Sequence, residues 1–585
     1  DIKIIKTKKG EYVCGSKEIS GESTENILRN EVPKLIKALD FPKTMRWNNS
    51  GDRFPRPVRW ILALLDRKPL RFKFAGIEAD RYSMPNLHFS FKPIRLEKPR
   101  EYLNFLRHGG VIADPNERYR LIVKRIKEAS RDFEGKPFLQ EEMIEAINCV
   151  VEYPEGVAGE FDRKYLDLPE EVMLSVFKTQ GNLIWIKPLN KFVCIFSARK
   201  KAFENVARGF TGVIAARLYD AHFYYQNDIK TGIEKMREQT RGMMWLQDLG
   251  SIYDKTERLS KLVQIFEGMN SVDTGKLQRA ARLCKADLLS QMVREKDFTA
   301  LQGIMGGYYA QIAGEDARVT QAIEEHYLPK FVGDAMPSTL EGCLLSAVDK
   351  FDNVIGAFLS GNRPTGSYDP LGVRRNGYAV INLFDTYAGN TNLLDAVKTL
   401  QEIYNREFDR AMIIDFFSER LDRYLEDLGF RYDEVNTVLA TWNGIVGDAR
   451  LRCEALRDLS DKPEFTKLVI GQKRVRNILK GIENIGKLDI DLLKEKSEIN
   501  LYNESSAIIQ DIKALLEQKN YKGVLKILLS LRPHIDKFFD DVMVMCDDEK
   551  IKANRLALLH YVNQIFLKFA DFSCIVIEGE KQEKS

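Results

Sequence analysis

Apolar residues recur at helical spacing through much of the second half of the chain. Residues 282–376 show the pattern most clearly, because apolar stripes with steps of three and four positions alternate with charged residues. Two of these stripes are Leu283, Ala286, Leu289 and Val293, and Leu344, Ala347, Val348, Phe351 and Ile355. The periodicity continues from about residue 246 to about residue 460, so we predict an almost wholly helical region there.

The first 240 residues mix shorter helix and strand signals. Residues 27–39 form an amphipathic pattern that predicts a helix. Its expected inward residues are Ile27, Val32, Leu35, Ile36 and Leu39. The continuous apolar run 58–66 predicts a buried strand, and Asp114, followed by Pro115, predicts the start of a helix. The fold class is therefore a multidomain α+β protein with a mixed α/β N-terminal region and a helical remainder.

Three carboxylates interrupt the apolar helices of the central region, namely Asp287, Asp349 and Asp352. A buried carboxylate needs a partner, a metal ion or a raised pKa. One interpretation is a metal site of the His-Asp phosphohydrolase type, which would also need imidazole ligands, and only His326 lies near in sequence. The other is that the carboxylates cap helices or pair with nearby cations, for which the candidates are Lys285, Lys350, Arg374 and Arg375.

The clearest local charge asymmetry lies at residues 467–480. The stretch carries Lys467, Lys473, Arg474, Arg476 and Lys480 and contains no acidic residue. An expected inward stripe of Val475, Ile478, Leu479 and Ile482 would turn the cations outward as a basic ridge. Such a ridge suits phosphate groups, although a basic helix face is more often simply solvated.

The totals are those of an ordinary globular protein. The 585 residues are 44% hydrophobic and 30% charged, with a net charge of +4, so several domains are expected and no anionic partner is demanded. The eight cysteines include no CxxC pair, which indicates neither a zinc knuckle nor a disulfide framework. No apolar run is long enough for a membrane span, and the chain opens without Met or a signal peptide. The tail 578–585 is polar, and we expect it to be frayed.

Several segments resemble a known family. LQGIMGGYYA, AIEEHYLPKFVGD, AVDKFDNVIGAF and PTGSYDPLGVRRN, between residues 301 and 376, resemble the helical core of the β subunit of the bacterial two-subunit glycyl-tRNA synthetase. In that family the core is a degenerate His-Asp domain, so Asp287, Asp349 and Asp352 would be vestigial. Residues 538–573 resemble the helical anticodon-binding domain shared with arginyl-type synthetases. The expected core of this domain is Val542, Val544, Leu558, Leu559, Val562, Ile565, Phe566 and Phe569.

The resemblance implies a domain order. It places a B3/4-like α/β region at residues 1–89, with the family's first segment missing ahead of Asp1, and a mixed α/β linker and tRNA-facing region at 90–240. A degenerate HD-like domain would follow at 241–395, then a helical connector at 396–460 and a DALR-like anticodon-binding domain at 461–585. Thr179-Gln180 departs from the family's His-Gln pair, which leaves any role of that His in doubt.

The resemblance also implies a function. The chain would be the tRNA-binding, non-catalytic β subunit of a cytoplasmic glycine–tRNA ligase, assembled with the catalytic α subunit as α2β2. ATP and Mg would bind at the α subunit, so we assign no catalytic residue, cofactor or metal ligand to this chain. The predicted contacts with tRNA(Gly) are Lys467, Lys473, Arg474, Arg476, Lys480, Lys552 and Arg555. The alternatives are an HD-type metal-dependent phosphohydrolase and a stand-alone RNA-binding scaffold.

Overall fold

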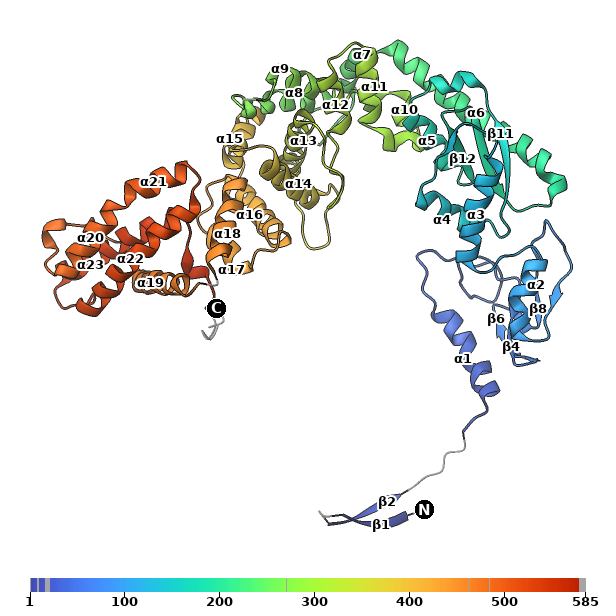
Figure 1. The fold of residues 1–585 in the computed structure, drawn as a ribbon, viewed down its shortest axis with the longest axis horizontal. Coiled ribbons are helices and arrows are strands. Elements are labelled where there is room, and N and C mark those ends of the chain that lie inside the picture. Colours follow the sequence, from blue (N-terminus) through green and yellow to red (C-terminus); the bar gives the residue numbers. More distant parts are fainter. Residues whose placement is uncertain are drawn as a thin grey trace. The chain divides into compact units, whose positions relative to one another are not determined.

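The computed structural model describes residues 2–7, 10–15, 21–269, 271–460, 462–482 and 484–577. The described chain is mostly helical with a few small sheets (Figure 1). It divides into two compact units, residues 1–223 and residues 224–585. The predicted frayed tail, 578–585, lies outside the described residues. The finer domain boundaries expected from the resemblance stay a prediction.

The first unit is built around a four-stranded antiparallel sheet. Its strands, in spatial order, are β10 (Lys136–Pro137), β12 (Leu183–Lys187), β13 (Lys191–Phe196) and β11 (Glu155–Glu160). The helices that belong with it are α3 (Pro115–Ala129), α4 (Glu141–Val150) and α5 (Glu170–Thr179). Helix α3 begins after Asp114, whose side chain accepts hydrogen bonds from two backbone N–H groups, as the sequence predicts.

Both faces of this sheet are buried. On one face Ile184 and Val193 belong to a cluster with Ile122 of α3 and Ile147 of α4. On the other face the ring of Trp185 stacks on Phe177 of α5, at 6.3 Å between centroids. Neighbouring residues of a strand point to opposite faces, so a strand with both faces covered is apolar throughout. This explains why β12 and β13 carry continuous apolar runs.

The N-terminal region corrects two expectations. Helix α1 (Thr24–Ala38) forms as predicted, but it contains no buried residue, and Ile27, Leu35 and Leu39 are exposed. A small cluster formed by Leu70, Phe72 and Ala79 contacts only one strip of α1, which is Leu28, Val32 and Ile36.

The apolar run 58–66 forms no single buried strand. It splits into β3 (Ile61–Leu62) and β4 (Leu64–Leu65), which are half-buried. The run changes partner at Ala63, because β3 pairs in parallel with β7 (Ile77–Asp80) and β4 pairs with β5 (Lys68–Pro69). The remaining elements of the first unit are β1 (Ile2–Thr7), β2 (Gly10–Gly15), β6 (Lys73–Phe74), β8 (Tyr82–Ser83), β9 (Ile94–Arg95), α2 (Tyr102–His108) and the start of α6 (Phe203–Thr231).

The described part of the second unit is helical, as predicted. Its helices up to residue 359 are α7 (Ile233–Gln239), α8 (Ile252–Leu262), α9 (Thr274–Leu283), α10 (Gln291–Arg294), α11 (Ile304–Ile312), α12 (Ala317–Glu325) and α13 (Leu340–Leu359). The next five are α14 (Val373–Thr386), α15 (Leu393–Tyr404), α16 (Arg410–Asp427), α17 (Tyr432–Leu439) and α18 (Val446–Ser460). Helix α13 is buried along most of its length and packs against α8, α9, α12 and α14.

The last five helices form a bundle, drawn in orange and red in Figure 1. They are α19 (Pro463–Leu479), α20 (Lys496–Ala507), α21 (Ile509–Glu517), α22 (Tyr521–Asp541) and α23 (Glu549–Leu567). All eight residues predicted to form its core, from Val542 to Phe569, are buried. No helix among the described residues is long and apolar enough to cross a membrane.

Candidate functional site

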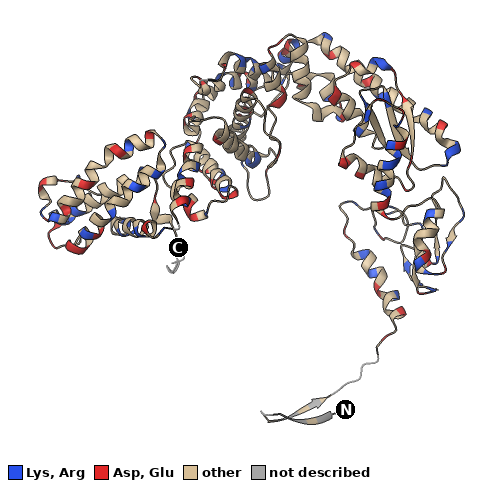
Figure 2. Cartoon of the chain, in the orientation of Figure 1, with Lys and Arg blue, Asp and Glu red and all other residues tan. Residues whose placement is uncertain are grey.

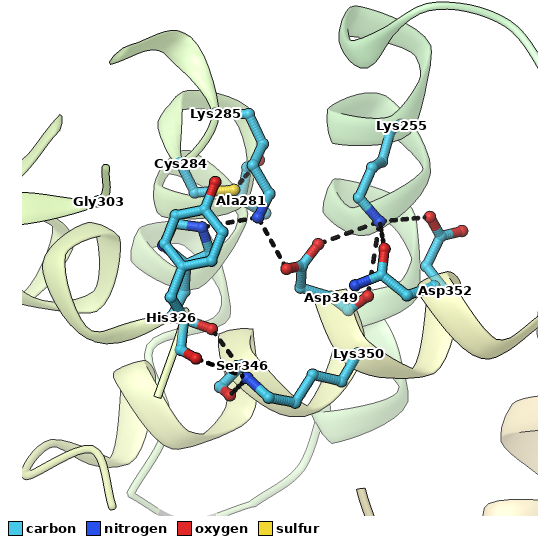
Figure 3. Close-up of polar contacts among 12 residues, drawn as sticks. Lys255, Ala281, Cys284, Lys285, Gly303, His326, Ser346, Asp349, Lys350 and Asp352 are labelled. Atoms are coloured by element: carbon cyan, nitrogen blue, oxygen red, sulfur yellow. Dashed lines mark hydrogen bonds and ion pairs between the residues drawn. The ribbon is translucent and has the colours of Figure 1, made fainter. Parts of the chain in front are cut away.

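Helix α13 carries two of the three central carboxylates into a buried charge network (Figure 3). The Asp349 carboxylate lies 2.8 Å from the Lys285 ammonium and 3.0 Å from that of Lys255. Lys255, on α8, also lies 2.8 Å from the Asp352 carboxylate. Asp352 further binds the Arg258 guanidinium at 3.3 Å and accepts a hydrogen bond from the Tyr404 hydroxyl at 2.7 Å. The network therefore links α8, α13 and the end of α15.

Electrostatics keep the Asp349 carboxylate charged. Burial by itself would raise its pKa, but the ammonium groups of Lys255 and Lys285 outweigh burial and hold the pKa well below its usual value. The partners expected from the sequence are thus confirmed for Lys285 only. Lys350 instead donates to backbone carbonyls at residues 326–328 and to the Ser346 hydroxyl, and burial lowers its pKa to about 7.

Asp287 and His326 are held separately. The Asp287 carboxylate accepts hydrogen bonds from the backbone N–H groups of Gly303, at 2.6 Å, and Gly306, at 3.2 Å, and burial raises its pKa to about 6. The His326 ring is neutral, because burial and the nearby Lys285 ammonium push its pKa well below the usual value. Its Nε2 accepts from the Lys285 ammonium at 2.9 Å, and its Nδ1 lies 2.6 Å from the Ile323 carbonyl.

This donor set does not suit a metal ion. The carboxylates face lysines and backbone N–H groups, and both ring nitrogens of His326 already have partners. Across the residues that the structure describes, no three His, Cys, Asp or Glu side chains come together as a metal-binding group. Of the two interpretations of the sequence, the contacts favour charge pairing.

The predicted basic ridge lies on α19, along which Lys and Arg residues recur (Figure 2). Lys467, Arg474, Arg476 and Lys480 are exposed and Lys473 is half-buried. The predicted inward stripe is partly wrong. Val475 is buried, but Ile478 and Leu479 are only half-buried, and the helix ends at Leu479, before Ile482. The buried side of α19 is formed instead by Phe465, Leu468, Val469, Gly471, Gln472 and Val475.

A groove of about 790 Å³ lies beside this ridge. From α19 and the segment after it come Lys473, Arg476, Asn477, Leu479, Lys480, Ile482 and Ile485. The opposite wall contributes His560 and Asn563 of α23, and Ser573. The sequence interpretation missed His560 and Asn563, although they stand three positions apart and thus lie on one face of a helix. We call these residues the α19–α23 groove.

Some of the predicted RNA-binding cations have acidic partners. Arg476 lies 2.6 Å from the buried carboxylate of Asp571, and Arg474 lies 3.9 Å from Asp536. Near the start of α23, Lys552 lies 3.3 Å from Glu549. The Arg555 side chain is only 12% exposed and lies 2.6 Å from the buried carboxylate of Glu498 on α20. Arg555 therefore joins two helices of the bundle and is turned away from solvent.

Comparisons with known proteins identify the family. Residues 1–440 match the family model described as glycyl-tRNA synthetase beta subunit, and residues 470–571 match that of the DALR anticodon binding domain. This chain belongs to the glycyl-tRNA synthetase beta subunit family. The second match covers α20–α23, most of α19 and nearly the whole α19–α23 groove.

Curated relatives agree with this assignment. The glycine–tRNA ligase beta subunits of a Sulfurihydrogenibium species and of Clostridioides difficile are 35% and 36% identical, over 98% of this chain. That of Aquifex aeolicus is 35% identical over 99% of this chain. These alignments span 84%, 85% and 85% of the three relatives. The chain is thus a ligase subunit of this family, with a helical anticodon-binding domain at its C-terminal end.

Proposed function

We propose that the chain binds the anticodon side of tRNA(Gly) through the α19–α23 groove. In the cytoplasm it would serve a catalytic α subunit, which holds ATP and Mg, within an α2β2 assembly. The observation that carries this proposal is the groove itself, because cations and neutral hydrogen-bonding side chains line one cavity inside the segment that matches the anticodon-binding domain. The predicted HD-like ancestry of residues 241–395 belongs to the same proposal and rests on the family resemblance alone.

The chemistry of the groove suits an unpaired RNA loop. Proteins read such loops by placing cations against the phosphates and by stacking on, or hydrogen bonding to, the exposed bases. Lys473 and Lys480 supply positive charge on the α19 side. On the α23 side, the His560 ring offers a surface for stacking, and the Asn563 amide offers a donor and an acceptor. The Asn563 carbonyl oxygen already accepts one hydrogen bond, from the Gln472 amide at 3.2 Å.

The cations of the ridge differ in what they can give to RNA. Arg476 already compensates the buried carboxylate of Asp571, so its replacement would also disturb the fold. Lys480 is exposed and has no carboxylate partner among the residues that the structure describes. It lies just past the last residue of α19 and lines the groove. Lys480 is therefore the first residue to test, together with Lys473, which lines the same side of the groove.

The test is a charge reversal of both lysines, Lys473→Glu with Lys480→Glu, in the full chain. A matched control is Lys513→Glu, because Lys513 is exposed on α21 of the same bundle and does not line the groove. Binding of tRNA(Gly) is measured at several salt concentrations. We expect at least tenfold weaker binding at low salt and a shallower salt dependence, because each lost phosphate contact reduces the slope by about 0.7–0.9. Equal losses in the control and the double variant would refute the groove as the interface.

A second experiment tests the division of labour. The chain is purified alone, and charging of tRNA(Gly) with glycine is measured with and without the catalytic α chain. We expect charging only in the mixture, and the mass of the mixed complex gives the stoichiometry. Charging by the isolated chain would overturn the proposed role. Turnover of a phosphate ester by the isolated chain, with stoichiometric metal, would instead support the hydrolase alternative.

A further inference from the structure

A second cavity, of about 470 Å³, opens beside the buried charge network of α13. Its charged lining residues are Lys255, Lys285, Lys330, Lys350, Arg375 and Asp349. Positive groups therefore outnumber carboxylates around it. The excess remains when the charged groups directly behind the lining are added, which are Arg258, Asp287, Asp334 and Asp352. The excess comes from the exposed side chains of Lys330 and Arg375, and a local excess of positive charge around a cavity favours the binding of an anion.

The cations at the floor of this cavity are fixed in place. Lys255 and Lys285 bind Asp349, as Figure 3 shows, and Lys350 donates to carbonyls and to Ser346. These side chains cannot swing out, so Lys255 and Lys285 act as a preorganised positive surface. Lys350, with a pKa of about 7, is about half protonated near pH 7. Burial is the main cause of the low pKa of Lys350, and the positive charges of Lys285 and Arg375 lower this pKa further. The low pKa is consistent with the local excess of positive charge.

The cations at the rim are different. Lys330, which follows α12, and Arg375, in the first turn of α14, are both exposed. Neither side chain has a carboxylate partner within the described part of the chain. An arginine at the mouth of a positively charged cavity is suited to a phosphate group, because its planar guanidinium can donate two parallel hydrogen bonds to phosphate oxygens.

The uncharged lining residues favour a ligand that carries a base as well as a phosphate group. Two aromatic residues, Trp245 and Tyr327, line the cavity together with the amide side chains of Gln302, Asn353 and Asn376. Cations of the chain already lie over both rings, Lys255 and Arg258 over Trp245 and Lys285 over Tyr327. The amide side chains are therefore the main groups that could hydrogen-bond a nucleobase. The volume is also within the usual range of about 300–1,000 Å³ for small-molecule sites.

We propose that this cavity binds a nucleotide. The phosphate would lie between Arg375 and Lys330, above the lysine floor, and the base would lie toward the aromatic and amide side chains. The nucleotide has two possible sources with the same chemistry, which are a free mononucleotide and the 5′-phosphorylated end of an RNA strand. This site is separate from the α19–α23 groove, since the two share no lining residue.

The experiment compares the double variant Arg375→Ala with Lys330→Ala against Arg374→Ala. Arg374 is the neighbour of Arg375 on α14, but it does not line the cavity. Both replaced rim side chains are exposed, so the double variant should fold, which an unchanged thermal midpoint would confirm. Calorimetric titration of the full chain then uses AMP, adenosine, and a six-nucleotide RNA with either a 5′-phosphate or a 5′-hydroxyl.

A free mononucleotide is supported if AMP binds at least tenfold more tightly than adenosine and the double variant loses at least tenfold in AMP affinity. The Arg374→Ala variant should stay within twofold of the original chain. An RNA end is supported if the 5′-phosphorylated RNA shows these differences and AMP does not bind. The proposal is overturned if neither AMP nor the phosphorylated RNA binds, if the phosphate makes no difference in both the AMP–adenosine pair and the RNA pair, or if Arg374→Ala weakens binding as much as the double variant. The Lys480→Glu change should leave AMP affinity unaltered, so failure here and failure of the proposed tRNA interface are distinguishable.

Discussion

Two regions of the helical unit use positive charge in opposite ways. Around α13, the lysines and Arg258 are buried and bound to carboxylates or carbonyls from helices distant in sequence. On α19, the cations are mostly exposed, and Arg474 and Arg476 pair with Asp536 and Asp571. In the sequence the two regions look alike, because each shows charged residues between apolar positions of a helix. Burial and partners, which come from the tertiary fold, fix the cations around α13 in place and leave most of those on α19 exposed.

The largest expected effect comes from breaking the buried network. Asp349→Ala would leave Lys255 and Lys285 buried without their shared carboxylate, so we expect the free energy of unfolding to fall by about 3–5 kcal/mol. The measurement is chemical unfolding followed by circular dichroism. A suitable control is Asp541→Ala, since the Lys537–Asp541 pair is exposed and its loss should cost less than about 1 kcal/mol. Similar losses for both variants would contradict the contrast between the two regions.

The next effect concerns Arg555, which the sequence placed among the RNA contacts. Arg555→Ala would remove the partner of the buried Glu498 carboxylate, so we expect a loss of about 3 kcal/mol in the free energy of unfolding. The affinity of the folded variant for tRNA, measured at low temperature, should change less than threefold. A variant of normal stability with severely weakened tRNA binding would return Arg555 to the interface.

A pH profile tests the burial of Asp287, the third central carboxylate, which lies outside the charge network. Burial raises the pKa of Asp287 to about 6, from 3.8, so between these values the folded state holds a proton that the unfolded state has lost. The contribution of Asp287 to stability is therefore present at low pH and is lost as pH rises, by about 2 kcal/mol between pH 4 and pH 6. Asp287→Asn keeps an oxygen for the N–H groups of Gly303 and Gly306, and unfolding at several pH values should show that this slope has disappeared. Identical slopes in both proteins would mean that Asp287 titrates normally.

The smallest effect is expected at Lys552, whose partner Glu549 is largely exposed. Lys552→Ala should change the free energy of unfolding by less than about 0.5 kcal/mol. Its effect on tRNA affinity should be smaller than that of Lys480→Glu, because Lys552 does not line the α19–α23 groove. Equal losses of affinity in the two variants would extend the interface to the start of α23.

The sequence predicted what depends on local periodicity. The long helices α13 and α16 follow from apolar spacing, and the start of α3 follows from its capping residue. Helix α23 and its buried side chains were expected from the family resemblance. Apolar periodicity predicted the wrong buried residues in two helices, α1, which packs against a small cluster, and α19, which ends earlier than expected. Helix α1 has only one narrow surface to pack against, so three of its apolar residues are exposed. Helix α19 ends at Leu479, and Gly481, which has a φ of 81°, is the residue in the sequence that marks this end.

The candidate sites were less predictable, because their partners come from elsewhere in the chain. Asp352 binds Lys255, which lies 97 positions away, and Tyr404, which lies 52 positions away. Arg555 turns inward because of Glu498, which is 57 positions distant. The residues His560 and Asn563 gain their place in the α19–α23 groove only through the packing of α19 against α23. Pairs of residues this far apart in sequence can be identified only once the tertiary structure is known.

The shared carboxylate of Asp352 also bears on how this part of the molecule moves. The Asp352 carboxylate binds side chains from both α8 and α15. If either helix moved away, the buried charge of Asp352 would lose a partner. Local opening should therefore involve all three helices together, as one cooperative segment. Amide hydrogens in α8, α13 and α15 would then exchange with solvent at a common slow rate, even though these helices are separated by long stretches of chain.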